Sequence, residues 1–286
     1  MNIADAVVQG ILVGGLYALF AAGLSLIFGV MRLVNIAHGD FIVLAAYVAM
    51  VVIEASGMNP FAALIVVVPL MAALGYVIQR FILNRTLGED LLPPILVTFG
   101  LAVIIQNGLL TLFSTDTRRL SAGPIETANL SLGGITVGVL PLITFASAVG
   151  LILLLEVGFF RSRLGRAFRA TSDDAETARA IGVNTRHIFA LAMALSFAVI
   201  AIAGVLLAVR SNFDPFSGPA RLIYGFEAVI IGGLGNLWGT LAGGVVIGVA
   251  QSLGAQISPA FQTLAGHLVF FAVLAIRPRG LFPRMD

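Results

Sequence analysis

The chain has 286 residues, of which 59% are hydrophobic and 10% charged, and its mean hydropathy is +1.05. This composition excludes an ordinary soluble domain and indicates a polytopic membrane protein. The chain contains no cysteine and no lysine, which excludes disulfides, thiol chemistry, a lysine Schiff base and a P-loop of its own for ATP hydrolysis.

Eight apolar runs are long enough to cross about 30 Å of hydrocarbon as helices, which rise about 1.5 Å per residue. No positive charge precedes the first run, so we interpret it as a retained transmembrane helix rather than a signal peptide. A further apolar segment, 226–235, is too short to cross, and Gly232, Gly233 and Gly235 break it. We predict one all-α transmembrane domain over residues 1–286 that includes this half-helix. The predicted spans are 7–30, 38–56, 61–83, 92–113, 138–160, 188–210, 238–254 and 263–276.

The distribution of arginine predicts the orientation, because cytosolic loops collect positive charge. If the eight spans simply alternate, nine arginines lie inside and seven outside; if the half-helix and the next span form a hairpin, the division is twelve to four. We therefore predict an external N-terminus, a cytosolic C-terminus, a cytosolic loop at 161–187 and an external loop at 114–137. The pI near 9.5 then reflects arginines beside anionic lipids, and we expect no nucleic-acid partner.

The loop at 161–187 is the most informative stretch, since it holds six arginines and the signals of a short helix. Asp173 followed three residues later by Glu176 is close to a capping box, and Gly182 is a natural stop after residues 175–181. The loop therefore predicts a cytosolic helix that another protein contacts.

Ionisable side chains within the spans are few. We expect the carboxylates to reach the membrane interface from span ends, and none forms the mid-membrane pair typical of a proton-coupled carrier. The histidines lack the spacing of a metal site, and no hydrolase motif occurs, so we predict no catalytic residue, no metal, no cofactor and no enzyme activity. These carboxylates are Asp40, Glu54, Glu156 and Glu227, and the histidines are His38, His187 and His267.

Asn35 and His38 are three residues apart and would share a helix face between the first two spans. With Arg32, Gly39 and Asp40 they form the densest polar cluster near a membrane helix. Two interpretations stay open, a hydrogen-bonded hinge and a role in gating.

Four motifs, in order, carry a resemblance to a known family. They are the opening stretch 15–31 with Val34-Asn-Ile-Ala-His-Gly39, the loop at 161–187, Ile231-Gly-Gly-Leu-Gly235 with later glycines, and the ending Arg277-Pro-Arg-Gly-Leu-Phe282. Over essentially its whole length the chain resembles the branched-chain amino acid permeases of ATP-binding-cassette (ABC) transporters.

The resemblance implies a bacterial inner-membrane subunit that pairs with a second permease, two cytosolic ATPases and an external substrate-binding protein to import leucine-like amino acids. It assigns ATPase coupling to Arg166, Arg169, Asp174, Ala178 and Gly182, although the chain has Glu176-Thr-Ala where ABC importers more commonly have Glu-Ala-Ala. Gating or pathway candidates are Asn35, His38, Gly39, Gly232, Gly233 and Gly235. An ion-coupled secondary transporter of small polar solutes and a membrane scaffold are the alternatives.

Overall fold

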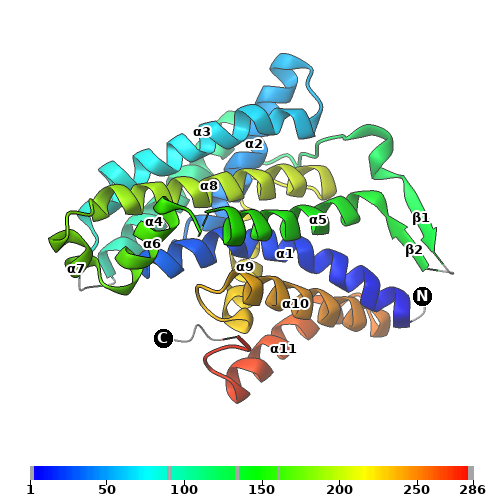
Figure 1. The fold of residues 1–286 in the computed structure, drawn as a ribbon. Helices are drawn as coiled ribbons and strands as arrows, with labels where there is room; N and C mark the ends of the chain where they lie inside the picture. Colours follow the sequence, from blue (N-terminus) through cyan, green and yellow to red (C-terminus); the bar gives the residue numbers. More distant parts are fainter. Residues whose placement is uncertain (1–2, 89, 91, 133–134, 160, 283–286) are drawn as a thin grey trace.

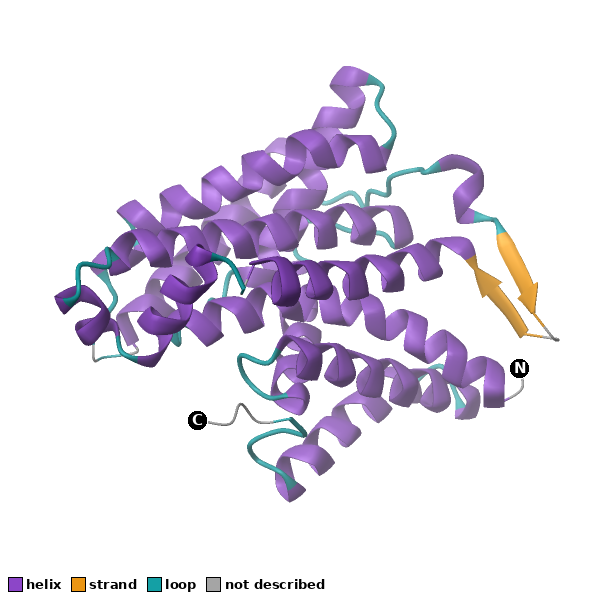
Figure 2. Cartoon of the chain, in the orientation of Figure 1, coloured by secondary structure: helices purple, strands orange, loops and turns teal. Residues whose placement is uncertain are grey.

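The computed structural model describes residues 3–88, 90, 92–132, 135–159 and 161–282, and these are almost entirely helical (Figures 1 and 2). The helices are α1 (Ile3–Met31), α2 (His38–Ser56), α3 (Pro60–Phe81), α4 (Leu92–Phe113), α5 (Val139–Leu153), α6 (Arg163–Asp173), α7 (Ala175–Ala180), α8 (Thr185–Arg210), α9 (Gly218–Gly232), α10 (Leu237–Ile257) and α11 (Phe261–Ile276). A 3₁₀ turn (Leu83–Arg85) follows α3 and a π-helical segment (Leu154–Phe159) continues α5, while a second 3₁₀ turn (Gly123–Glu126) lies between α4 and β1. Strands β1 (Asn129–Leu132) and β2 (Ile135–Gly138) pair antiparallel, with Asn129 opposite Gly138.

Within these described ranges, seven helical stretches are long and apolar enough to cross a membrane. They match seven of the predicted spans, and α11, which is shorter at 16 residues, occupies the eighth. The half-helix is longer than predicted, because α9 begins at Gly218 rather than near residue 226. Its first turn contains Pro219 and Arg221, a proline at the position where helices tolerate it and a charge that an apolar-run criterion rejects. The all-α membrane fold is confirmed.

Side-chain caps fix where several helices begin. Asn59 accepts from the amide of Phe61 at the start of α3 (2.9 Å), and Asn236 accepts from the amide of Gly239 at the start of α10 (2.9 Å). Asn184 does the same for His187 at the start of α8 (3.1 Å). Each asparagine satisfies one of the amides that a helix start leaves unpaired.

Helix α1 is the centre of the bundle, since 83% of its most apolar window is buried against 17% for α4. It packs closely on α10 through glycines. A Cβ added at Gly244 would lie 2.6 Å from the Gly14 carbonyl oxygen, so only glycine allows the two backbones this approach. The glycine-bearing faces of α1 and α10 therefore meet.

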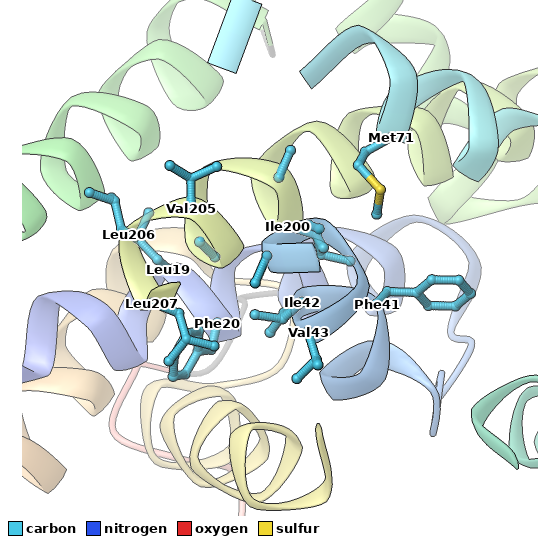
Figure 3. Packing of buried hydrophobic residues seen from close by; sticks show 14 of the residues in the cluster. Leu19, Phe20, Phe41, Ile42, Val43, Met71, Ile200, Val205, Leu206 and Leu207 are labelled. Carbon is cyan, nitrogen blue, oxygen red and sulfur yellow. The ribbon is translucent and has the colours of Figure 1, made fainter. Parts of the chain in front are cut away.

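The core lies where α1, α2, α3 and α8 converge (Figure 3). Large apolar side chains from all four helices are buried there, whereas α3 and α4 expose residues such as Ile65, Leu96 and Ile104 on their outer faces. An outer face of this composition is what lipid requires. Core residues seen in the figure are Leu19, Phe20, Phe41, Ile42, Val43, Met71, Ile200, Val205, Leu206 and Leu207.

The loops gather at two opposite ends. The start of α1 and the β1–β2 hairpin lie at one end, and α6 and α7 lie at the other (Figure 1). The described part of the segment 114–137 therefore lies at the opposite end from α6 and α7. It is more ordered than a plain loop, because Glu126 accepts from Arg119, from Ser121 and from the amide of Ala122. These hydrogen bonds lower the pKa of Glu126.

Candidate functional site

Two helices, not the single one predicted, occupy the loop at 161–187, and the first of them is fixed to the bundle. Ser162 caps α6 by accepting from the amide of Gly165 (3.1 Å). Phe168 is fully buried among apolar side chains of α1, α5, α8 and α10. Arg166 and Arg169 lie on the exposed side of the same helix. Helix α6 therefore has one face bound to the transmembrane helices and an arginine-bearing face in solvent.

Helix α7 is capped by Asp174, and the predicted capping box from Asp173 to Glu176 is wrong by one residue. Asp173 ends α6, while the Asp174 carboxylate accepts from the amides of Glu176 (2.9 Å) and Thr177 (3.0 Å) and from the Thr177 hydroxyl (2.5 Å). The hydroxyl first, and then the amides, hold the pKa of Asp174 below its ordinary value. Two adjacent aspartates made the sequence signal ambiguous.

The end of α7 confirms Gly182 as the helix stop. Its φ is +93°, and the amides of Gly182 and Val183 donate to the carbonyls of Arg179 and Ala178, the paired bonds of a Schellman turn. Ala178 itself is buried and supports the loop from within. Ile181, by contrast, is 74% exposed at the tip. An isolated apolar tip beside arginines has the composition of a contact surface.

The loop is connected to the ends of the transmembrane helices. The Ser172 hydroxyl donates to the carbonyl of Gly29 near the end of α1 (2.5 Å), and Gly29 lies against Gly235, since a Cβ at Gly29 would be 3.2 Å from the Gly235 Cα. On the other side of the loop, Tyr76 of α3 hydrogen-bonds His187 of α8 (2.9 Å). These hydrogen bonds join α6 to α1, and α3 to the start of α8.

The glycine turn between α9 and α10 is tight and braced. Gly233 and Gly235 have φ of +103° and +79°, conformations that favour glycine. The C-terminal segment closes over it, because the amide of Leu281 donates to the Ile231 carbonyl (2.7 Å) and Asn236 donates to the Phe282 carbonyl (3.0 Å). Gly232 packs directly on the backbone of Gly239. The predicted break is therefore a structured hairpin turn.

Four members of the predicted cluster around His38 are buried, whereas Arg32 is exposed. Asn35 precedes α2, where its side chain accepts from the amide of Ala37 (3.1 Å), so the shared helix face predicted for Asn35 and His38 is wrong. His38 starts α2 and donates from Nε2 to the Phe20 carbonyl in the middle of α1 (2.8 Å). Gly39 packs on the backbone of Gly218, so the starts of α2 and α9 meet inside the bundle.

Two of the four carboxylates, Asp40 and Glu227, do not lie where we predicted. The other two, Glu54 and Glu156, are exposed near helix ends, as expected. Asp40 is buried and accepts from Gln106 of α4 (2.9 Å), and Glu227 is 5% exposed and paired with His267 of α11. We placed Glu227 at a helix end because the predicted apolar segment began at residue 226, whereas α9 begins at Gly218. Pro219 was the signal that could have found it, because proline is favoured in the first turn of a helix and so indicates an earlier start of α9.

Helices of membrane length around a buried central helix define a multi-pass membrane protein. Residues 6–276 match the family model described as the branched-chain amino acid transport system permease component. The match spans nearly the whole chain, so the protein belongs to this family and is a permease component of a transport system.

Several relatives support the assignment. The chain is 28% identical to the permease protein BraD of Pseudomonas aeruginosa, a high-affinity branched-chain amino acid transport system component, over 98% of this chain and 95% of BraD. LivH of Salmonella typhimurium is 28% identical over 97% and 94% of the two chains. LivM of Escherichia coli is 25% identical over 94% of this chain and 68% of LivM. Among solved structures, PsaBC from Streptococcus pneumoniae in complex with Fab matches with 14% identity and a TM-score of 0.48, covering 95% of this chain and 91% of that one.

Proposed function

We propose that this chain is the membrane-spanning subunit of an ABC importer for branched-chain or related amino acids in a bacterial inner membrane. The observation that carries the proposal is the family match over residues 6–276. The names of BraD and LivH, high-affinity branched-chain amino acid permeases, support the substrate class. The chain contributes a translocation path and no catalytic residue.

Energy for transport comes from separate ATPase subunits, because a chain without lysine has no P-loop lysine to bind nucleotide phosphates. Their docking site is the α6–α7 loop. Arg166 and Arg169 offer exposed charge, Ile181 offers an apolar tip, and Asp174 and Gly182 hold α7 at its two ends. The loop is rigid enough to transmit a push, since caps and a Schellman turn fix its helices.

Closure of the ATPases displaces the α6–α7 loop, and the loop displaces the helices that line the translocation path. The Ser172–Gly29 hydrogen bond passes displacement to the end of α1, and the contact of Gly29 with Gly235 passes it to the turn between α9 and α10. Helices α2 and α9 meet at Gly39 and Gly218 inside the bundle. These shifts separate the two helix starts there and so open the translocation path. Asn35 and His38 position the start of α2 at this point.

The proposed partners follow from the same geometry. Escherichia coli LivH and LivM are both permease proteins of a high-affinity branched-chain amino acid system, and both resemble this chain, which favours a second permease beside it. The 114–137 segment, whose described part is ordered around Glu126 and lies at the end opposite α6 and α7, is the contact for an external substrate-binding protein. Buried mid-bundle carboxylates also suit an ion-coupled carrier, but the family match favours the ATP-driven importer.

Co-purification tests the docking site. The chain is expressed with its second permease and ATPase subunits, and Arg166 and Arg169 are both changed to Glu. Reversed charge should release most of the ATPase, because charge complementarity selects partners. The matched control is Arg80→Glu, an exposed arginine at the end of α3 outside the loop. Undiminished ATPase recovery with the double variant would refute the assignment.

A further inference from the structure

A continuous row of polar side chains crosses the middle of the bundle through four helices. The Tyr17 hydroxyl of α1 donates to Gln251 of α10 (2.5 Å), and the Tyr17 ring stacks on Tyr224 of α9 with centroids 4.8 Å apart. Tyr224 stacks in turn on His267 of α11 (6.4 Å), whose Nδ1 donates to Glu227 of α9. We call Gln251, Tyr17, Tyr224, His267 and Glu227 the polar row. No residue of the row belongs to the loop at 161–187, which we call the coupling loop, or to the glycine turn between α9 and α10.

The row lies deep within the membrane-spanning part. Tyr17 is the central residue of α1, and α9 crosses α1 at this level, because a Cβ at Gly225 would lie 3.5 Å from the Phe20 backbone. Ionisable groups at such depth face the interior of a bundle or a water-filled path, since lipid does not solvate them. A carboxylate and an imidazole retained here therefore point to a functional site.

Two atoms of the row are buried with bonding capacity unused. Glu227 Oε2 is an acceptor and Gln251 Nε2 is a donor, and neither has a hydrogen-bond partner among the described residues. An unpaired buried polar atom is costly, so native proteins rarely keep one without a use. Within the row, Glu227 contacts His267 and Gln251 contacts Tyr17.

This chemistry matches the ammonium group of an amino acid. A carboxylate oxygen beside aromatic faces attracts a positively charged ammonium group through charge and cation–π contact. Building on the proposed function, we infer that the polar row is a transient binding site in the translocation path for the ammonium group of the substrate, from which Glu227 accepts.

The row opens at the side of the chain. The His267 side chain is 33% exposed, whereas that of Glu227 is 6% exposed, so the pair leads from the interior to the face at α9 and α11. At mid-membrane depth a polar pair on that face lies against the path or a second permease rather than lipid. Substrate reaches Glu227 from this side.

The first test needs no substitution. The complete membrane complex, assembled from wild-type chain, second permease and ATPases, is arrested with a non-hydrolysable ATP analogue and exposed to radiolabelled leucine without binding protein. Unlabelled leucine and its 2-hydroxy analogue, which lacks the ammonium group, compete for the label. Leucine should displace the label at a concentration at least about tenfold lower than its 2-hydroxy analogue needs. Equal competition would overturn the site.

The second test separates substrate handling from structure. Glu227→Gln keeps the size of the side chain and removes its charge, and Glu54→Gln is the control at an exposed carboxylate of α2. We measure leucine imported per ATP hydrolysed in proteoliposomes with loaded binding protein. Glu227→Gln should lower this ratio about tenfold while binding-protein-stimulated ATPase stays within about twofold, and Glu227→Asp should recover part of it.

The outcomes separate the two ideas. If wild-type complex imports no leucine with ATP, the proposed function fails. If it does, and Glu227→Gln leaves the import ratio unchanged, only the site fails. A variant that loses assembly, ATPase and import together shows that the Glu227–His267 pair is a structural latch, and this result also contradicts the inference.

Discussion

Replacing Gly182 by valine should uncouple the permease from its ATPases. The φ of Gly182 is +93°, and a Cβ built there meets nothing within 4 Å, so the substitution adds backbone strain without a clash. Holding a residue with a Cβ in this region costs roughly 1–2 kcal/mol, and β-branching makes it less tolerant. That energy lowers the fraction of loops with a closed Schellman turn by a factor of about 5–30.

Co-purification of ATPase subunits and ATP-driven uptake in proteoliposomes measure the effect, and both should fall together. Gly57→Val is the matched control, because Gly57 ends α2 with φ of +68°, also in open space, but lies outside the coupling loop. Gly182→Asn should recover much of the function, since asparagine tolerates the left-handed region. Normal ATPase recovery and uptake with Gly182→Val would show that the loop is a solvated connector.

Three further predictions concern packing, the α7 cap and topology. Gly244→Ala should destabilise the detergent-purified chain by about 1–3 kcal/mol in thermal unfolding, because its Cβ would press on the Gly14 carbonyl, whereas Gly100→Ala, in open space on α4, should be neutral or stabilising; equal melting temperatures would contradict the packing. The folded pKa of Asp174 lies below its unfolded value, so its contribution to α7 is complete above the unfolded pKa and lost as pH falls through the folded one. Wild-type ATPase association should therefore weaken in acid. Asp174→Ala should weaken the association at neutral pH and remove this dependence on acid, and an acid profile equal to that of the wild type would count against the cap. In intact cells an impermeant maleimide should label Ser131→Cys but not Ala180→Cys in this cysteine-free chain, and the reverse pattern would invert the orientation.

Hydrophobicity alone predicted most of the fold. Membrane helices are long, apolar and bounded by loops, so α2 and α4 begin and end at the predicted residues. The glycine stop at Gly182 was also predictable, because a left-handed helix end selects glycine locally. These features depend on near neighbours in the chain.

Long-range pairing was not predictable from one sequence. The partner of Glu227 is His267, forty residues away, and the partner of Asp40 is Gln106 on another helix. Hydropathy placed both carboxylates near span ends because it contains no information on the tilt of a helix or its depth in the membrane. The cap of α7 failed for a different reason, since Asp173 and Asp174 carry the same local signal and only the backbone conformation separates them.

The central claim, an ATP-driven permease rather than an ion-coupled carrier, is tested most directly by the energy source of uptake. Proteoliposomes containing the chain with its second permease and ATPases receive loaded binding protein, with ATP enclosed and all ion gradients collapsed by ionophores. We expect leucine to accumulate, and this accumulation to stop when ATP is replaced by a non-hydrolysable analogue. Accumulation by the chain alone, driven by an ion gradient without ATP, would contradict it.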